Sequence, residues 1–285
     1  MKTILVTGGD GQLGLSIRAV EKQHGRGNNF VYLTSSDFDL TNPLQMEKAI
    51  EEYSPAYIIN CAAYTAVDKA ENENEKAFAV NAEGATALAR LCSANGIVLI
   101  HVSTDFVFEG NTPLPLTEEL PTVPTGVYGE SKLLGERGIV KEMNAFFILR
   151  TSWLYSEFRN NFLKTMIRLG NERDELSVVY DQIGTPTYAK DLAEVIFHII
   201  NSSSDAFGIY HYSNEGVASW YDFANEIFTI SGITINLKPI SSAEYPTPAK
   251  RPAYSVMNKS KIKESLKITI NHWTGSLSNC IKNIQ

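Results

Sequence analysis

Tyr128 and Lys132 are the pair of residues in this sequence whose types and spacing most directly suggest chemistry. They stand one helical turn apart, next to residues 130–143, where the pattern predicts a helix, so both side chains are expected on one face. A free tyrosine has a pKa near about 10, and a neighbouring ammonium favours the phenolate and lowers that pKa toward the range of general acid–base catalysis. Alone, this pair also fits an ordinary surface contact.

Ser103-Thr104-Asp105 follows a run at residues 97–102 that reads as a buried strand. Ligands of open α/β sheets lie at the carboxyl ends of parallel strands. A hydroxyl at Thr104 is therefore placed to hydrogen-bond a substrate carbonyl and to share its polarisation with Tyr128. Asp105 is placed to orient a sugar hydroxyl. The alternative is that these side chains only cap and close a turn.

Three spaced glycines, Gly8, Gly11 and Gly14, follow a strand at residues 4–6 and open a helix at 13–20. Glycine permits a tight turn and a close approach of the backbone to a pyrophosphate, which the N-terminus of the helix then binds. This context favours a dinucleotide-binding loop. The alternative is a glycine turn that only reverses the chain.

The choice between NADPH and NADH stays open. The second strand, at residues 30–33, has neither an acidic residue immediately at its tip to select NAD nor an arginine for a 2′-phosphate. Ser35 and Ser36 can hydrogen-bond either ribose. Asp39-Leu40 fits a place beside the adenine, or a polar loop that Asp39 caps.

The elements that must position these residues alternate between strand and helix through residue 150. Further strands are predicted at 57–62 and 146–149, and further helices at 74–95 and at 44–53, the latter with Asn42 as cap and Pro43 in the first turn. Such alternation predicts an α/β fold with a Rossmann-type, doubly wound parallel sheet.

The second half changes character, which suggests a smaller C-terminal substrate-binding lobe. Its expected elements are helices at 161–170, 189–200 and 221–230, strands at 176–179 and 208–212, and a proline-rich loop at 245–252. We expect residues 1–150 to form the dinucleotide-binding domain, with segments at about 180–200 returning to it. Residues 151–285 are expected to be mainly the substrate-binding lobe.

Composition limits the classes of partner. The 285 residues carry a net charge of −7 and no basic run, so we expect no nucleic-acid partner. We expect neither a membrane span nor a signal peptide, because no apolar stretch is long enough. Three widely spaced cysteines, Cys61, Cys92 and Cys280, fit a reducing compartment. A soluble, cytoplasmic protein is expected.

These residues together resemble the extended short-chain dehydrogenase/reductases and, among them, the dTDP-4-dehydrorhamnose reductase family. The resemblance runs nearly end to end. It rests on Gly11-Gln12-Leu13-Gly14, on residues 60–71, 103–110, 128–136, 150–155 and 181–187, and on the loop 245–252.

The resemblance implies NADPH- or NADH-dependent reduction of the C4 ketone of dTDP-4-dehydro-L-rhamnose to dTDP-L-rhamnose, a precursor of cell-surface polysaccharides such as the O-antigen of lipopolysaccharide. Tyr128 would be the proton donor, Lys132 its electrostatic partner and Thr104 the third catalytic residue. The substrate would contact Thr104, Asp105, Trp153 and Arg251. The implied cofactor-binding residues are Gly8, Gly11, Gln12, Leu13, Gly14, Asp39, Leu40, Ala63, Tyr64, Thr65, Val102, Tyr128 and Lys132.

Two of these assignments have simple alternatives: Trp153 as a core aromatic, and Arg251 as a solvated loop charge. The sequence also departs from the family in two places. Some members hold magnesium between subunits through an acidic residue after the last glycine, but Leu15, Ser16 and Ile17 stand there. We therefore expect no metal, and a monomer or weak homodimer. The family's Arg-Pro-x-Asn-Ser reads Arg-Pro-Ala-Tyr-Ser at 251–255.

Two other functions remain alternatives. One is a reductase, epimerase or dehydratase acting on another nucleotide sugar, although dehydratases of this superfamily place acidic residues beside the catalytic threonine and Phe106 follows Asp105 here. The other is a non-catalytic NADP-binding regulatory subunit, as in the beta subunit of methionine adenosyltransferase. The presence of Thr104, Tyr128 and Lys132 favours catalysis.

Overall fold

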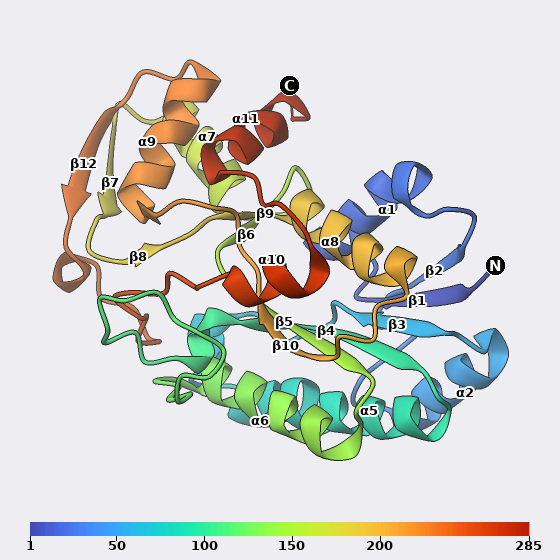
Figure 1. Ribbon diagram of the computed structural model, residues 1–285. Coiled ribbons are helices and arrows are strands. Elements are labelled where there is room, and N and C mark those ends of the chain that lie inside the picture. Colours follow the sequence, from blue (N-terminus) through green and yellow to red (C-terminus); the bar gives the residue numbers. More distant parts are fainter. Residues whose placement is uncertain (285) are drawn as a thin grey trace.

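A six-stranded sheet in which every strand pair is parallel organises the computed structural model, which describes residues 1–284 (Figure 1). Its order is β10–β5–β4–β3–β1–β2. The order reverses between β1 and β3, where open α/β sheets bind ligands. The predicted doubly wound fold class is confirmed. The strands are β1 (Thr3–Thr7), β2 (Asn29–Leu33), β3 (Tyr57–Asn60), β4 (Val98–Thr104), β5 (Phe146–Thr151) and β10 (Gly208–His211).

Helices cover both faces of this sheet, which is why its strands are mostly apolar. In β1, Ile4 and Val6 pack on one face and Leu5 packs on the other. The first face is covered by α1 (Gln12–His24), α8 (Ala189–Ser202) and α10 (Ser260–Leu266), and the second by α2 (Pro43–Tyr53), α5 (Ala85–Ala94) and α6 (Val127–Glu142). Strand β10 and helices α8 and α10 therefore join the sheet from beyond residue 150.

The predicted start of α2 is confirmed. Pro43 is its first residue, and the side chain of Asn42 accepts a hydrogen bond from the Gln45 backbone N–H. This cap satisfies one of the free N–H groups at the helix start.

The uninterrupted helix predicted over residues 74–95 is wrong in its middle. The segment divides into α4 (Asn74–Phe78), a π-helical turn η1 (Ala79–Gly84) and α5, and a short α3 (Val67–Ala70) precedes it. The wider turn carries Asn81, whose buried side chain accepts from Tyr64 N at 2.9 Å and donates to Tyr64 O and to Ser131 Oγ, both at 3.0 Å. The interruption thus fixes the loop that contains Tyr64.

Strand β4 is longer than predicted and includes Ser103 and Thr104, which pair with Arg150 and Thr151 of β5. The polar side chains are compatible with a strand here because the strand end opens toward a cavity. Thr104 also caps the following 3₁₀ turn, η2 (Asp105–Val107), since its Oγ1 accepts from Phe106 N at 3.2 Å.

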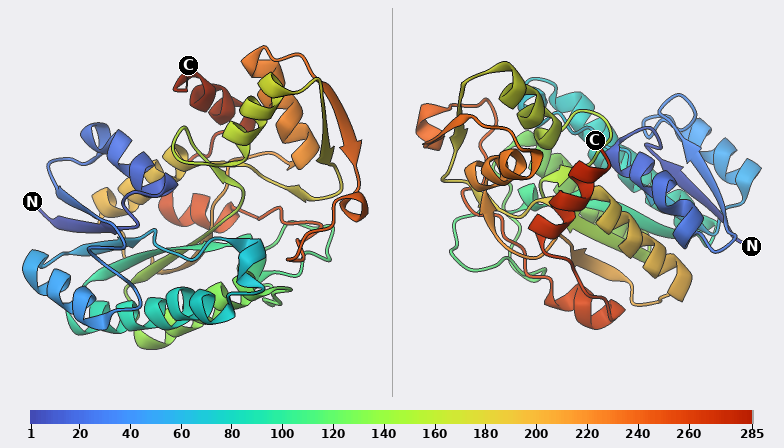
Figure 2. Two further views of the ribbon diagram at one scale, coloured as in Figure 1. Left: turned by 180° about the vertical axis from the view of Figure 1, so that it is seen from behind. Right: turned by 90° about the horizontal axis from the view of Figure 1, so that it is seen from above.

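The remaining elements surround a separate apolar cluster. Figure 2 shows them grouped on the side away from the N-terminus. Strand β12 was not predicted, because Pro239 interrupts its pattern; it pairs with β7 alone, as a proline-containing strand can at an edge. The elements around this cluster are β6 (Leu154–Tyr155), α7 (Phe162–Glu172), β7 (Glu175–Val179), β8 (Ile183–Gly184), β9 (Thr187–Tyr188), β11 (Ala218–Ser219), α9 (Trp220–Ser231), β12 (Asn236–Ile240), η3 (Ser242–Glu244) and α11 (Trp273–Lys282).

Across residues 1–284, no helix is both long and apolar enough to cross a bilayer. The same residues include no group of three or more His, Cys, Asp or Glu side chains arranged to hold a metal ion. The three cysteines are free, and Cys92 and Cys280 are buried.

Candidate functional site

A cavity of about 860 Å³ lies where the sheet order reverses, at the carboxyl ends of the central strands. It gathers most of the residues selected from the sequence. Gly14, Ser36 and Arg251 do not line it. The selected residues that do are Gly8, Gly11, Gln12, Leu13, Asp39, Leu40, Ala63, Tyr64, Thr65, Val102, Thr104, Asp105, Tyr128, Lys132 and Trp153.

The glycine loop fits a dinucleotide pyrophosphate. Gly8 has a φ of +62°, and a Cβ there would lie 2.9 Å from Ala62 N, so only glycine fits without strain. Gly11 precedes α1, no side chain caps that helix, and its first turn holds no acidic residue. The free N–H groups and the positive end of the helix dipole are thus available to an anion.

Gly14 acts through packing. A Cβ on Gly14 would lie 2.5 Å from Gly8 O and 2.7 Å from Gly9 Cα. Its lack of a side chain lets α1 approach the loop closely, as the third glycine of such loops does.

The tip of β2 contributes Ser35, Asp39 and Leu40 to the cavity, but Ser36 does not line it. Asp39 Oδ1 accepts from the backbone N–H and the hydroxyl of Thr41, both at 2.8 Å. The carboxylate therefore caps its own loop, as one alternative for Asp39 expected, and the residue also lines the cavity.

Tyr128, in the first turn of α6, lies beside Thr104 at the end of β4. Its ring packs edge-on against Phe106, with centroids 5.6 Å apart. Burial raises the pKa of Tyr128 to about 12, with Asp105 acting in the same direction and the Thr104 hydroxyl opposing it. This is opposite to the lowering expected from Lys132, because burial of the phenol has the largest effect on its pKa.

Lys132 is 1% exposed and extends toward β4. Its Nζ donates to Val102 O at 2.7 Å and lies 3.1 Å from His101 Nε2. Burial lowers the pKa of Lys132 to about 8, and the negative charge of Glu136 opposes that shift. The side chain is held in place and loses its proton more readily than an exposed lysine does.

Asp105 presents an unsatisfied oxygen. Its Oδ1 accepts from Thr104 Oγ1 at 3.1 Å, whereas Oδ2 is buried and has no partner within residues 1–284. Burial raises the pKa of Asp105 to about 6, against the lowering effect of the nearby Ser255 and Thr104 hydroxyls. Buried polar atoms are nearly always hydrogen-bonded in proteins, so a ligand hydroxyl is the natural partner for this oxygen.

Trp153 sits on the cavity wall with a φ of +47°, a conformation that is strained for a bulky residue. Its indole stacks on Trp220, with ring centroids 3.7 Å apart and an interplanar angle of 10°. Gly184 permits this arrangement, because a Cβ there would lie 2.7 Å from Trp153 Cε2. Trp153 therefore packs in the core and also lines the cavity.

Arg251 lies on a second cavity, of about 890 Å³, which Trp220 also lines. Its Nη1 and Nη2 donate to the two carboxylate oxygens of Asp68, at 3.0 and 2.8 Å. These hydrogen bonds lower the pKa of Asp68. Arg251 is thus paired and not a free solvated charge.

Sequence reasoning missed Arg159 and Asn160, which also line the first cavity. Arg159 Nε donates to Asp10 O at 2.6 Å and its Nη2 donates to Asp10 Oδ2 at 2.9 Å, joining the glycine loop to the segment before α7. No motif marks Arg159 in the sequence. Asp10 lies within the glycine run, and that position was the available signal.

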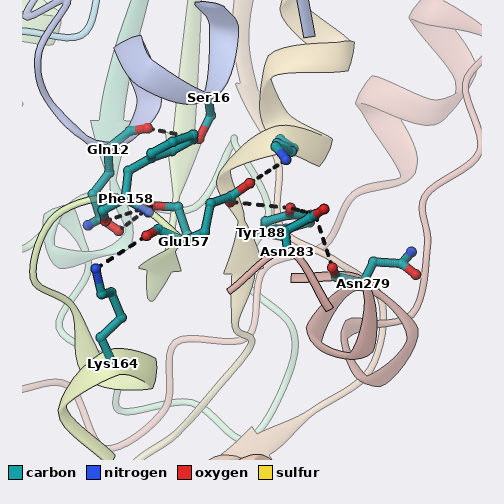
Figure 3. A network of polar contacts seen from close by, with 10 residues as sticks. Gln12, Ser16, Glu157, Phe158, Lys164, Tyr188, Asn279 and Asn283 are labelled. Atoms are coloured by element: carbon teal, nitrogen blue, oxygen red, sulfur yellow. Dashed lines mark hydrogen bonds and ion pairs between the residues drawn. The ribbon is translucent and has the colours of Figure 1, made fainter. Parts of the chain in front are cut away.

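A polar network secures the same junction (Figure 3). Gln12 Oε1 accepts from Ser156 Oγ and from Asn161 Nδ2, both at 2.9 Å. Nearby, the Glu157 carboxylate accepts a hydrogen bond from the Tyr188 hydroxyl at 3.3 Å and forms an ion pair with Lys190. Gln12, at the start of α1, is thus hydrogen-bonded to residues 156–161, and Glu157 of this segment is paired with Lys190 of α8.

Comparisons with known proteins agree with this geometry. The family model described as "RmlD substrate binding domain" matches residues 1–285. A dTDP-4-dehydrorhamnose reductase of Sinorhizobium fredii is 42% identical over 282 residues, which cover 96% of this chain and 94% of that protein. Two crystal structures, each covering 99% of both chains with a TM-score of 0.95, are similar. They are a dTDP-4-dehydrorhamnose reductase of Clostridium acetobutylicum, 40% identical, and one of Bacillus anthracis in complex with NADP, 38% identical.

Proposed function

The chain belongs to the RmlD substrate binding domain family, and from this premise we propose that it reduces the C4 ketone of dTDP-4-dehydro-L-rhamnose to the alcohol of dTDP-L-rhamnose, using NADPH or NADH. One observation carries the proposal: Tyr128, Lys132 and Thr104 line the same cavity as the glycine loop. The names of the relatives and the NADP in the Bacillus anthracis structure support it.

The nicotinamide cofactor supplies the hydride when bound. Gly8, Gly11, Gln12 and Leu13 would hold its pyrophosphate at the N-terminus of α1. The rest of the cofactor would lie along the other selected residues of the cavity, which are Asp39, Leu40, Ala63, Tyr64, Thr65 and Val102.

Tyr128 donates the proton that the forming alkoxide needs. Because burial raises its pKa to about 12, the phenol stays protonated at neutral pH and the donor is loaded before each turnover. The Thr104 hydroxyl hydrogen-bonds the same oxygen and stabilises the developing charge.

Lys132 stabilises the tyrosinate that remains after proton transfer. Its own contacts to Val102 O and His101 hold the amine at the cavity wall without a bond to Tyr128. Solvent then restores the proton.

The sugar would bind between Asp105 and Trp153. The free Oδ2 of Asp105 is suited to accept from a sugar hydroxyl, and Trp153 offers an aromatic platform. The nucleotide would extend toward the second cavity, because the stacked Trp153 and Trp220 line one cavity each. Arg251, held by Asp68 there, would face the diphosphate.

Assembly and location are further parts of the proposal. We infer a dinucleotide-binding domain at 1–150, joined by the later segments of the sheet, and a mainly substrate-binding part at 151–285. We also infer a cytoplasmic monomer or weak homodimer with no nucleic-acid or membrane partner. The net charge of −7 and the free thiols of Cys61, Cys92 and Cys280 support these inferences.

The test is to mix the purified chain with dTDP-4-dehydro-L-rhamnose and NADPH or NADH, and to follow loss of the reduced nicotinamide absorbance. We expect one equivalent of cofactor to be oxidised for each equivalent of sugar reduced. An epimerase or dehydratase would leave the cofactor unchanged at the end of the reaction, and a regulatory subunit would give no turnover. Either result would contradict the proposal.

A further inference from the structure

Three buried polar side chains lie in register across the centre of the sheet. Thr7 of β1 is paired with Asn60 of β3, and Asn60 is paired with His101 of β4. Each is at most 1% exposed. They point to the face that α6 covers, since in β1 the residue two positions before Thr7, Leu5, packs on that face. Most other positions of these strands are apolar.

Hydrogen bonds join these side chains into one chain that ends at Lys132. Thr7 Oγ1 donates to Asn60 Oδ1 at 2.7 Å, and Asn60 Nδ2 donates to His101 Nδ1 at 2.9 Å. His101 Nε2 then lies 3.1 Å from Lys132 Nζ. At the other end, Thr7 Oγ1 accepts from Ala62 N at 3.4 Å. This row of hydrogen bonds runs from the edge of the glycine loop to Lys132.

The donors and acceptors of these side chains allow the row of hydrogen bonds to run in either of two directions. With Asn60 Nδ2 directed at His101 Nδ1, the imidazole proton is on Nε2 and donates to Lys132, which requires a neutral amine. An ammonium on Lys132 has only donors, so His101 Nε2 must then accept. The imidazole proton moves to Nδ1, and the Asn60 amide must turn over to present Oδ1.

We propose that His101 is a positioning residue that holds Lys132 at the cavity wall and ties the proton on Lys132 to the tautomer of its own imidazole and to the orientation of the Asn60 amide. The inference rests on the proposed role of Lys132. It adds an internal route by which a proton change at the active site reaches Thr7, the residue before the glycine loop.

The groups around the pair favour a change of tautomer over a change of charge. Burial and the Lys132 ammonium both hold the pKa of His101 well below its usual value, so the imidazole stays neutral. Around Lys132, the charge of Glu136 opposes the effect of burial on the Lys132 pKa, and the neighbouring Cys61 is a neutral thiol because burial raises its pKa to about 12. Within residues 1–284, the direct hydrogen-bond partners of Lys132 Nζ are Val102 O and His101.

The test that needs no substrate is nitrogen NMR of the full chain labelled with ¹⁵N-histidine, which distinguishes the two neutral tautomers. Between about pH 6 and about pH 10, a range that spans the Lys132 pKa of about 8, the His101 proton should move from Nδ1 to Nε2 as pH rises. His211 is an internal control, because its ring nitrogens contact Leu116 O and Arg150 and not Lys132. It should keep one tautomer.

Replacing Lys132 with Met should abolish the tautomer change at His101 and leave His211 unaltered. A His101 ring that keeps one tautomer throughout the range in the wild-type chain, or that changes equally in the Lys132→Met variant, would overturn the proposal. Neither of these NMR results depends on which sugar the protein reduces.

A second measurement uses the reaction. His101→Phe keeps an aromatic ring but removes the lysine contact, so the ammonium is less stabilised and the pH at which kcat/KM changes with Lys132 should fall by about one to two units. His211→Phe removes another buried histidine and should lower stability without moving that profile. Equal profiles for His101→Phe and wild type would overturn the proposal, whereas absence of wild-type turnover would refute only the proposed function.

Discussion

Glu136 of α6 and Arg150 of β5 form a bidentate ion pair in the interior, with side chains 2% and 3% exposed. Arg150 Nη2 donates to Glu136 Oε2 at 2.6 Å, and Ser103 Oγ donates to Glu136 Oε1 at 2.5 Å. Because Tyr128, Lys132 and Glu136 succeed one another at single turns of α6, the ion pair anchors the helix that carries the site to β5. The Ser103 hydrogen bond anchors the same helix to β4, the strand that ends in Thr104.

Glu136→Ala should lower the free energy of unfolding by about 3–5 kcal/mol, since it leaves the Arg150 charge buried without a partner. Urea denaturation of both proteins measures the difference. Glu172→Ala, which breaks the exposed pair of Glu172 with Arg168, is the matched control and should leave stability nearly unchanged. Equal losses in the two variants would show that the interior pair does not anchor α6.

Asp105→Asn should stabilise the protein at alkaline pH while impairing activity. The pKa of Asp105 is about 6 in the folded state and about 3.9 in an unfolded chain, so the ionised form is disfavoured by folding and stability is lost as pH rises through about 4 to 6. A neutral amide avoids that loss, which amounts to roughly 2–3 kcal/mol above this range.

Thermal or urea unfolding at about pH 8 and about pH 4 checks this prediction. The stabilisation should be present at the higher pH and absent at the lower one. A variant that is equally or less stable than wild type at the higher pH would show that burial of the ionised Asp105 carboxylate does not lower the stability of the protein.

Trp220→Ala should weaken sugar-nucleotide binding through Trp153. Loss of the stacked partner removes about 0.5–1.5 kcal/mol of aromatic contact, and Trp153 already holds a strained backbone. We expect KM for the sugar nucleotide to rise about two- to tenfold, with NADPH binding unchanged. Trp220→Phe, which keeps an aromatic face, should recover most of the loss. A fall in kcat at constant KM would instead place Trp220 in the chemical step.

Gly14→Ala should weaken NADPH binding about tenfold or more, because overpacking moves α1 away from the loop. The added Cβ would lie 2.5 Å from Gly8 O. Gly275→Ala is the control: it also lies in a helix, but its Cβ would meet nothing within 4 Å. Fluorescence titration with NADPH compares the two, and unaltered affinity in Gly14→Ala would contradict the packing role.

The sequence predicted the sheet and the glycine loop well, because their signals are local, whereas the resemblance to the reductase family implied most other residues that line the cavity. Short apolar runs that alternate with helical patterns mark β1 to β5, and short sequence spacings mark Gly8, Gly11, Tyr128 and Lys132. The π-helical turn at Asn81 escaped prediction, since its cause is a contact with Tyr64 and Ser131.

What could not be predicted depends on contacts between distant segments. The stack of Trp153 on Trp220, the pairing of Arg251 with Asp68 and the bond of Arg159 to Asp10 each join residues that no spacing relates. The pKa of Tyr128 was expected in the wrong direction because burial of the phenol, which depends on how distant segments pack, has the largest effect on it. The sequence places Lys132 one turn away, but Val102 O and His101 hold its nitrogen.

The kinetics of the Tyr128→Phe variant test the central claim most directly, with dTDP-4-dehydro-L-rhamnose as substrate and NADPH affinity measured in parallel. The account predicts that kcat falls by about 10²–10⁴-fold while the Kd for NADPH stays close to that of wild type, since only the proton donor is lost. Turnover near the wild-type rate in a variant that binds NADPH normally would contradict it.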